Sequence, residues 1–248
     1  MDSPTASQSS DIVIVHSSDL HVDDGYTACS HGGDGTVGLR AVLQTARALN
    51  ADLVLLAGDI FEHNRLKLDL LDATARLLDD AGAPVVILPG NHDPIIPESA
   101  YRRGGVSDPK NVHVLGVTHE EAVLLPEFEL EIWGHAHRDY ADMSPLRSPR
   151  PRSTRWQIAA AHGHYEAVPD LTQKHHPSWL IDQAEIDATG ADYVALGHWN
   201  TPVEITDGAV PAYYSGSPEL AKTVNLVRLT QSGSVEVTRE AILWDYAP

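Results

Sequence analysis

The sequence predicts a layered α/β fold, and three observations support this prediction. Short runs rich in valine, isoleucine and leucine alternate with stretches in which leucine and alanine recur at helical spacing. Residues 1–110 combine both patterns, whereas the rest of the chain consists mostly of strand-like runs. Of the 248 residues, 42% are hydrophobic and 21% charged, a composition that suits one large core. We expect a single domain at residues 11–248 without a separate capping domain, preceded by a flexible N-terminus at residues 1–10.

The first part of the chain has the order of a βαβαβ unit. Three apolar runs bounded by turn residues are typical of buried strands: residues 11–16, 52–57 and 84–88. The stretches between them, residues 36–50 and 66–81, have helical periodicity, and Gly82 followed by Pro84 marks the end of the second. This order predicts parallel strands joined by right-handed crossovers.

The rest of the chain is predicted to be mainly β-structure. Strand-like runs occupy residues 112–115, 122–125, 129–133, 157–161 and 192–196, and a terminal hairpin is expected at residues 224–229 and 234–242. Residues 179–188 are compatible with a helix. The proline- and arginine-rich residues 143–154 are expected to form an exposed, mobile loop.

The charge and composition exclude several classes of protein. With 17 basic and 35 acidic residues the net charge is −18, which opposes long-range attraction to nucleic acid. No apolar run approaches ~18 residues, so no membrane span is expected. The single cysteine, Cys29, excludes an internal disulfide, and residues 1–10 lack the features of a signal peptide. We therefore expect a cytoplasmic protein.

Polar residues follow five of the predicted strands. In chain order they are Asp19 and His21, then Asp59, then Asn91, His92 and Asp93, and finally His162 and His198. Because strands joined in this way collect functional groups at their carboxyl edge, we expect these side chains to lie close together. Carboxylate, imidazole and amide oxygen in one cluster suit divalent Mn, Fe, Zn or Ni. One aspartate between two such ions can bridge them at ~3.5–4 Å, as in sites that cleave phosphoesters.

Each of these residues has a simpler interpretation when it is taken alone. Asp19 and His21 could belong to a solvated turn, and Asp59 could begin the turn after its strand. His162 and His198 each follow an apolar strand, where a core histidine is more common than a metal ligand. The combination of all these groups at one sheet edge favours the metal site.

The same residues resemble the motifs of the calcineurin-like metallophosphoesterase superfamily. Asp19-Leu20-His21, Gly58-Asp59, Gly90-Asn91-His92-Asp93, a lone His162 and Gly197-His198 occur in the order of that family, and the resemblance covers about residues 11–220. It implies an α/β/β/α sandwich of two mixed β-sheets flanked by helices. Residues 58–61 (GDIF), 90–94 (GNHDP), 192–197 (DYVALG) and 214–219 (YSGSPE) also resemble the DNA double-strand-break-repair exonuclease branch.

The resemblance implies a role for each site residue. One metal ion would be held by Asp19, His21, Asp59 and Asn200, and the other by Asp59, Asn91, His162 and His198. His92 would be the catalytic residue that contacts the phosphate or protonates the leaving oxygen, and Asn91 would also face the substrate. The implied cofactors are two divalent ions, with Mn²⁺ favoured over Fe, Zn or Ni. The implied reaction is hydrolysis of a phosphodiester or nucleotide-like phosphate ester by a metal-activated hydroxide.

The sequence departs from the family pattern at three places. The family usually ends its last motif Gly-His-x-His, and here Asn200 stands at the final position, so we expect the first metal site to be looser. Gly134-His135-Ala136-His137 matches that motif literally, but it precedes His162, and we interpret His135 and His137 as loop residues near the cleft. Repair nucleases carry a histidine directly after Gly-Asp-x-Phe, where this chain has Glu62.

Two alternative functions remain at this point. The first is a DNA exonuclease subunit that works with an ATPase partner, although such nucleases usually carry a capping domain and a partner-binding segment for which the chain leaves little room. Residues 147–155 would be its candidate phosphate-binding stretch, with a solvated loop as the simpler interpretation. The second is a catalytically weakened binding module that retains the fold. The expected partner is a phosphate-ester substrate; nucleic acid is disfavoured by the net charge, and the sequence identifies no protein partner.

Overall fold

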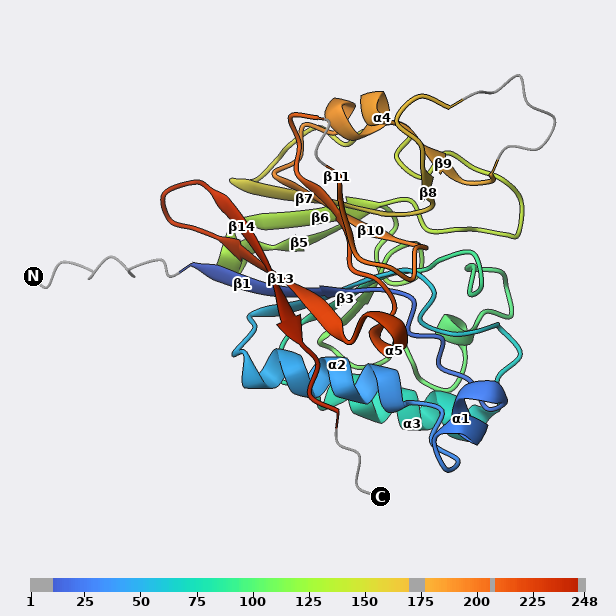
Figure 1. The fold of residues 1–248 in the computed structure, drawn as a ribbon. Helices are drawn as coiled ribbons and strands as arrows, with labels where there is room; N and C mark the ends of the chain where they lie inside the picture. The colour runs from blue at the N-terminus through green and yellow to red at the C-terminus, as the bar shows by residue number, and fades with distance from the viewer. Residues whose placement is uncertain (1–10, 170–176, 206–207, 245–248) are drawn as a thin grey trace, which may run out of the picture.

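Two six-stranded β-sheets packed face to face form the centre of the molecule, and helices cover their outer faces (Figure 1). The computed structural model describes residues 11–169, 177–205 and 208–244. The predicted N-terminal segment, residues 1–10, lies outside the described residues. The predicted α/β/β/α arrangement of two mixed sheets is confirmed.

The first sheet contains the βαβαβ unit and has the strand order β14-β13-β1-β2-β3-β4. Its strands are β1 (Ile12–Ser17), β2 (Leu53–Ala57), β3 (Val85–Leu88), β4 (Val112–Val114), β13 (Thr223–Leu229) and β14 (Val235–Ala241). The strands β1 to β4 are parallel, and the terminal hairpin β13–β14 joins them antiparallel to β1, as predicted for its two strands. The helices α2 (Val37–Ala48) and α3 (Leu68–Asp79) cross over below this sheet (Figure 1). Because both faces are covered, β2 and β3 are buried along their whole length.

The second sheet has the order β11-β12-β10-β7-β6-β5. It comprises β5 (Ala122–Leu125), β6 (Leu130–Gly134), β7 (Trp156–His162), β10 (Tyr193–Gly197), β11 (Val203–Ile205) and β12 (Ala212–Tyr214). The inner strands β6, β7, β10 and β12 are parallel, and the edge strands β5 and β11 are antiparallel to their neighbours. The helix α4 (Gln183–Ala188) lies on its outer side (Figure 1).

Shorter elements complete the described chain. They are α1 (Tyr26–Ser30), α5 (Pro218–Ala221), the two-stranded sheet of β8 (His164–Tyr165) and β9 (Leu180–Ile181), and 3₁₀ turns at Ala100–Arg102 and Pro126–Phe128. No helix in the described ranges is both long and apolar enough to span a bilayer.

The strands β2 and β3 pack against β7 and β10 of the other sheet. Both layers are therefore joined through a core of aliphatic residues, in which Leu55, Ile87, Ile158 and Ala195 have no exposed surface. Burial of this surface on both sheets is the main favourable contribution to folding. It also aligns the carboxyl ends of strands from both layers at one edge of the molecule.

Two local expectations from the sequence need correction. Residues 179–188 do not form one helix: Leu180–Ile181 pairs with β8, and the helix begins only after Asp182. Asp182 accepts a hydrogen bond from the amide of Glu185, whose side chain accepts from the amide of Asp182, and this capping box fixes the helix start. Residues 143–154 contain no helix or strand, as expected. However, Arg150 and Arg152 of this segment are paired with acidic residues, so the segment is anchored to the sheet.

Candidate metal centre

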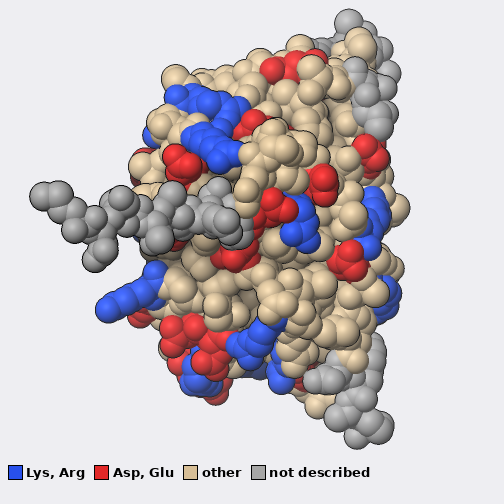
Figure 2. Space-filling view, turned by 90° about the vertical axis from the view of Figure 1, so that its left-hand side faces the viewer, with Lys and Arg blue, Asp and Glu red and all other residues tan. Residues whose placement is uncertain are grey.

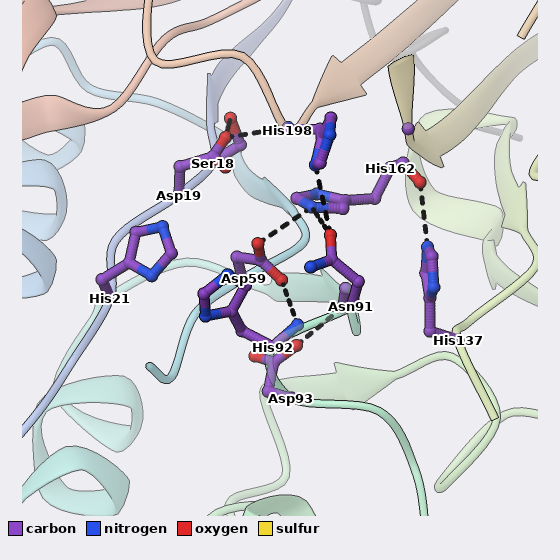
Figure 3. A network of polar contacts seen from close by, with 12 residues as sticks. Ser18, Asp19, His21, Asp59, Asn91, His92, Asp93, His137, His162 and His198 are labelled. Atoms are coloured by element: carbon purple, nitrogen blue, oxygen red, sulfur yellow. Dashed lines mark hydrogen bonds and ion pairs between the residues drawn. The ribbon is translucent and has the colours of Figure 1, made fainter. Parts of the chain in front are cut away.

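The polar residues at the carboxyl ends of β1, β2, β3, β7 and β10 lie together in one cluster (Figure 3). Asp59 is at its centre and is 2% exposed. Its Oδ2 lies 3.0 Å from Nε2 of His162, and its Oδ1 accepts a hydrogen bond of 2.9 Å from the amide of His92. The amide oxygen of Asn91 lies 3.1 Å from Nε2 of His162 and 3.2 Å from Nδ1 of His198. The predicted convergence of strand ends from both sheets is thus present in the fold.

Two groups of candidate ligands share Asp59. Asp19, His21 and Asp59 form the first group, and Asp59, His162 and His198 form the second; in each, the ligand atoms lie within 4.8 Å of one another. Two groups that share one carboxylate fit two neighbouring divalent cations with that carboxylate between them. The donor set of carboxylate and imidazole, with the amide oxygen of Asn91 beside the second group, suits the transition metals named from the sequence.

The backbone holds several of these residues in an uncommon conformation. Asp19, His21 and Asp59 have φ of 55°, 47° and 53°, and His198 has φ of 104°. Left-handed conformations are unusual for residues other than glycine and persist where the surroundings enforce them. Here the amide of Asp19 donates to the carbonyl of Gly58 at 3.0 Å, and the amide of His21 donates to the carbonyl of Asp59 at 3.1 Å. The turns after β1 and β2 therefore fix each other.

Two glycines allow the strand ends to approach closely. A Cβ atom on Gly58, which has φ of 93°, would lie 2.0 Å from Nδ1 of His162. A Cβ atom on Gly197 would lie 1.9 Å from the carbonyl oxygen of Ala57, at the end of β2 in the other sheet. Glycine is therefore required at both positions for the two sheets to meet at the cluster.

Burial and close charges shift the pKa values of the central residues. Burial alone would raise the pKa of Asp59, but the charge and hydrogen bond of His162 lower it well below its usual range. Burial lowers the pKa of His162, yet Asp59 and then Asp19 raise it to about 9. Burial raises the pKa of Asp19, with the charge of Asp59 acting in the same direction and that of His162 against it. Two buried carboxylates in one cluster make the centre favourable for positive charge.

His92 lies beside this centre and its side chain is 40% exposed. Its Nδ1 is 3.0 Å from the backbone carbonyl of Glu62. Since a carbonyl can only accept, Nδ1 carries the proton, and Nε2 is left free to accept a proton or, in the imidazolium, to donate one. The ring meets that of His21 edge to face, with centroids 4.9 Å apart.

Asp93 does not pair with His92. It is fully buried and accepts hydrogen bonds from the amides of Ile60 and Gly90 and from the hydroxyl of Tyr101, at 2.8, 2.7 and 2.6 Å. Burial and the charge of Asp59 raise its pKa to about 6. Asp93 therefore ties the turn after β3 to the turn after β2, which positions Asp59 and Asn91.

Glu62 is a site residue that sequence reasoning missed. Its Oε2 lies 2.7 Å from Nδ1 of His21, and its Oε1 lies 3.5 Å from Nδ1 of His92. The only signal in the sequence is its place directly after Gly-Asp-Ile-Phe, where the resembled nucleases have histidine. Its carboxylate lies close enough to orient both imidazoles.

Asn200 and the two early histidines lie at the margin of the cluster. Asn200 is exposed in the turn after β10, and its backbone carbonyl accepts from the amide of Ser217; no side-chain hydrogen bond links it to the cluster within the described ranges. His137 is buried behind His162, with its Nε2 2.9 Å from the carbonyl of that residue. His135 contacts the carbonyl of Arg147. Neither histidine belongs to a candidate ligand group among the described residues.

A model of the calcineurin-like phosphoesterase family matches residues 12–202. The chain belongs to this family. Members of this family are phosphoesterases, and the family generally uses two divalent metal ions.

Similar proteins agree with this assignment. The uncharacterized metallophosphoesterase YhaO of Bacillus subtilis (strain 168) is 28% identical over 205 residues, which cover 76% of this chain and 48% of YhaO. The chain thus spans about half the length of this curated relative. The crystal structure of TT1561 of Thermus thermophilus superimposes with a TM-score of 0.59 at 15% identity, covering 92% of this chain and 98% of that one. Another solved structure, also 15% identical, superimposes with a TM-score of 0.61 over 94% of this chain and 100% of its own. These two similarities show the fold.

Proposed function

We propose that this phosphoesterase hydrolyses a phosphodiester or a nucleotide-like phosphate ester with two divalent metal ions, Mn²⁺ being favoured. The observation that carries the proposal is the sharing of the buried Asp59 by two candidate ligand groups. Two ions bridged in this way would activate water and neutralise the phosphate oxygens during in-line attack.

The proposed ligands divide between the two ions. Asp19, His21 and Asp59, with Asn200 as a weaker fourth ligand, hold the first ion, and Asp59, Asn91, His162 and His198 hold the second. Support for the second set is stronger, because the Asn91 oxygen lies between the nitrogens of His162 and His198. Support for Asn200 is limited to its place in the chain, two residues after His198.

His92 is the proposed catalytic residue. It stands beside Asn91 on the open side of the cluster, where both residues line the adjoining cleft. The carbonyl of Glu62 holds Nδ1, so that Nε2 is the atom available to meet the phosphate or to protonate the leaving oxygen. The carboxylate of Glu62 also lies 3.5 Å from Nδ1 and helps to hold the ring in this orientation.

Two variants separate metal binding from proton transfer. Asp59→Asn should lose most bound metal and nearly all hydrolysis, because the bridging charge is removed. His92→Ala should retain metal while turnover of a chromogenic phosphodiester falls ~10²–10⁴-fold, as for a lost general acid. Metal content by atomic emission and steady-state rates are measured for both variants and the wild type. Equal metal loss in both variants would contradict the proposed roles.

A DNA exonuclease of the repair branch receives less support. The net charge is −18, and the face around the start of β1 carries interspersed basic and acidic side chains (Figure 2). Arg150 lies 3.2 Å from the buried Glu131, and Arg152 lies 2.6 Å from Asp192, so two of the four arginines in residues 147–155 are already paired with carboxylates. These observations favour a small phosphodiester over duplex DNA as the substrate.

A further inference from the structure

A cleft of about 670 Å³ opens directly beside the candidate metal centre. Asn91 and His92 line it on the side of the metal centre, while Tyr140 and Trp179 contribute an aromatic surface and Arg65 and Arg103 two cations. The volume lies within the range of sites that bind small organic molecules. A phosphate held at the metal centre would leave the rest of its substrate in this cleft.

Trp179 is fixed in place by its own contacts. The amide of Trp179 donates to Oδ1 of Asp142 at 2.6 Å, and its indole nitrogen donates to the carbonyl of Ala141 at 3.0 Å. The Trp179 ring lies edge to face with His198, a proposed ligand, with centroids 5.8 Å apart. Tyr140, directly before Ala141, is 60% exposed. Since the indole N–H is already satisfied, Trp179 presents an aromatic rather than a hydrogen-bonding surface to a ligand.

The charges around the cleft are balanced. Arg103 donates to the carbonyls of Asn64 and Leu66 at 2.9 and 3.1 Å, and no carboxylate of the described residues lies within 4.0 Å of its guanidinium or that of Arg65. Glu62 and Glu98 also line the cleft. Two cations and two anions give the cleft no net attraction for a polyanion, which leaves its aromatic surface as the feature that selects the ligand.

We propose that this cleft binds the base of a mononucleotide ester, with the ring stacked on Trp179 and Tyr140. The inference rests on the proposed function, because the phosphate is taken to occupy the metal centre. Every nucleobase offers a π-face, so stacking on such a surface selects for a base without selecting a particular one. Trp179 and Tyr140 are thus specificity-determining residues, which distinguish nucleotides from phosphates of open-chain alcohols and sugars.

The experiment compares adenosine 5′-monophosphate with ribose 5-phosphate, which carries a hydroxyl group at C1 in place of the base. Their binding to the Mn²⁺-loaded chain is measured by calorimetry, and their inhibition of phosphodiester hydrolysis is measured in parallel. The wild type should bind the nucleotide roughly 5- to 100-fold more tightly, as expected for base stacking. Trp179→Leu and Tyr140→Leu should each reduce this ratio while the affinity for ribose 5-phosphate is kept. Tyr26→Leu is the matched control, since Tyr26 is 81% exposed in α1 and does not line the cleft.

The outcomes separate this inference from the proposed function. Hydrolysis with equal affinities for the two ligands would overturn the base site and leave the phosphoesterase function standing. Nucleotide preference without any hydrolysis would support the base site and count against the proposed reaction. A preference that survives in both cleft variants, or falls equally in Tyr26→Leu, would also overturn the inference. Because Tyr140 is largely exposed, Tyr140→Leu tests the cleft even where Trp179→Leu fails to fold.

Discussion

Replacing Gly58 with alanine would test whether the position of His162 determines metal binding. The added Cβ would lie 2.0 Å from Nδ1 and 2.4 Å from Cγ of His162, whereas ordinary contacts begin at 3.4 Å. The ring therefore has to move by about 1.4 Å. The same nitrogen is held 2.9 Å from the carbonyl of Ala57, so this movement breaks its anchor. It also carries Nε2 away from Asp59 and Asn91, to which it is now 3.0 and 3.1 Å.

The size of the effect follows from this displacement. Loss of an outer partner of a metal ligand typically costs ~10–100-fold in affinity, so displacement of the ligand itself should cost the tighter site at least ~100-fold. Alanine at φ of 93° adds a backbone cost of about 1 kcal/mol or more. Gly233→Ala is the matched control: its φ is 92°, in the turn between β13 and β14, and its Cβ would meet no atom within 4 Å.

The assay is a metal titration with a competing chelator dye, accompanied by thermal unfolding. We expect Gly233→Ala to lose some stability but no metal affinity, and Gly58→Ala to lose both. Wild-type metal affinity in a folded Gly58→Ala variant would refute the reasoning, because it would show that His162 can move without affecting the site.

Two further predictions concern stability and the weaker metal site. His16 is fully buried, and its Nδ1 lies 2.9 Å from the Tyr193 hydroxyl. Burial lowers the pKa of His16 from 6.5 to about 3. The stability that neutral His16 contributes is therefore complete above pH 6.5 and declines as the pH falls below that value. When the pH is lowered from 7.5 to 5, the free energy of unfolding measured with urea should fall by about 2 kcal/mol more in the wild type than in His16→Gln. An equal fall in both proteins would contradict this prediction. Asn200→His should tighten the site formed by Asp19 and His21 and lower the Mn²⁺ concentration needed for half-maximal activity. Identical activity titrations for this variant and the wild type would show that position 200 does not contact the ion.

The sheets and the cluster could be predicted because their signals are local. The strands predicted at residues 52–57 and 84–88 form at residues 53–57 and 85–88, which are buried along their whole length, as strands covered on both faces must be. The side chains at their carboxyl ends meet because parallel strands end at the same edge. Asp59 and Asn91 could therefore be placed near each other without any knowledge of the loops between them.

The parts that the sequence did not reveal depend on distant partners. β9 is only two residues long and forms because it pairs with β8, so no periodicity in the sequence predicts it. Glu131 lies fully buried near the start of β6, where a carboxylate is unexpected. Its carboxylate accepts hydrogen bonds from Arg150 and Ser153 of the loop and from Gln157 of β7. The same contacts explain why that loop is anchored. A pattern of residue types does not show which distant residues will supply such partners.

The geometry of the site is set by backbone contacts as much as by its side chains. Left-handed conformations at Asp19, His21, Asp59 and His198 are each unfavourable for an isolated chain, by an amount of order ~1 kcal/mol. At Asp19, His21 and Asp59 they are retained because the turns after β1 and β2 hydrogen-bond to each other. Asp93 adds the turn after β3 to this framework. Side chains fixed in this way need little rearrangement to bind an ion. The hydrogen bonds between these turns do not involve Oδ2 of Asp59, which faces His162. Asp59→Asn therefore tests the chemistry of that oxygen rather than the folding of the turns.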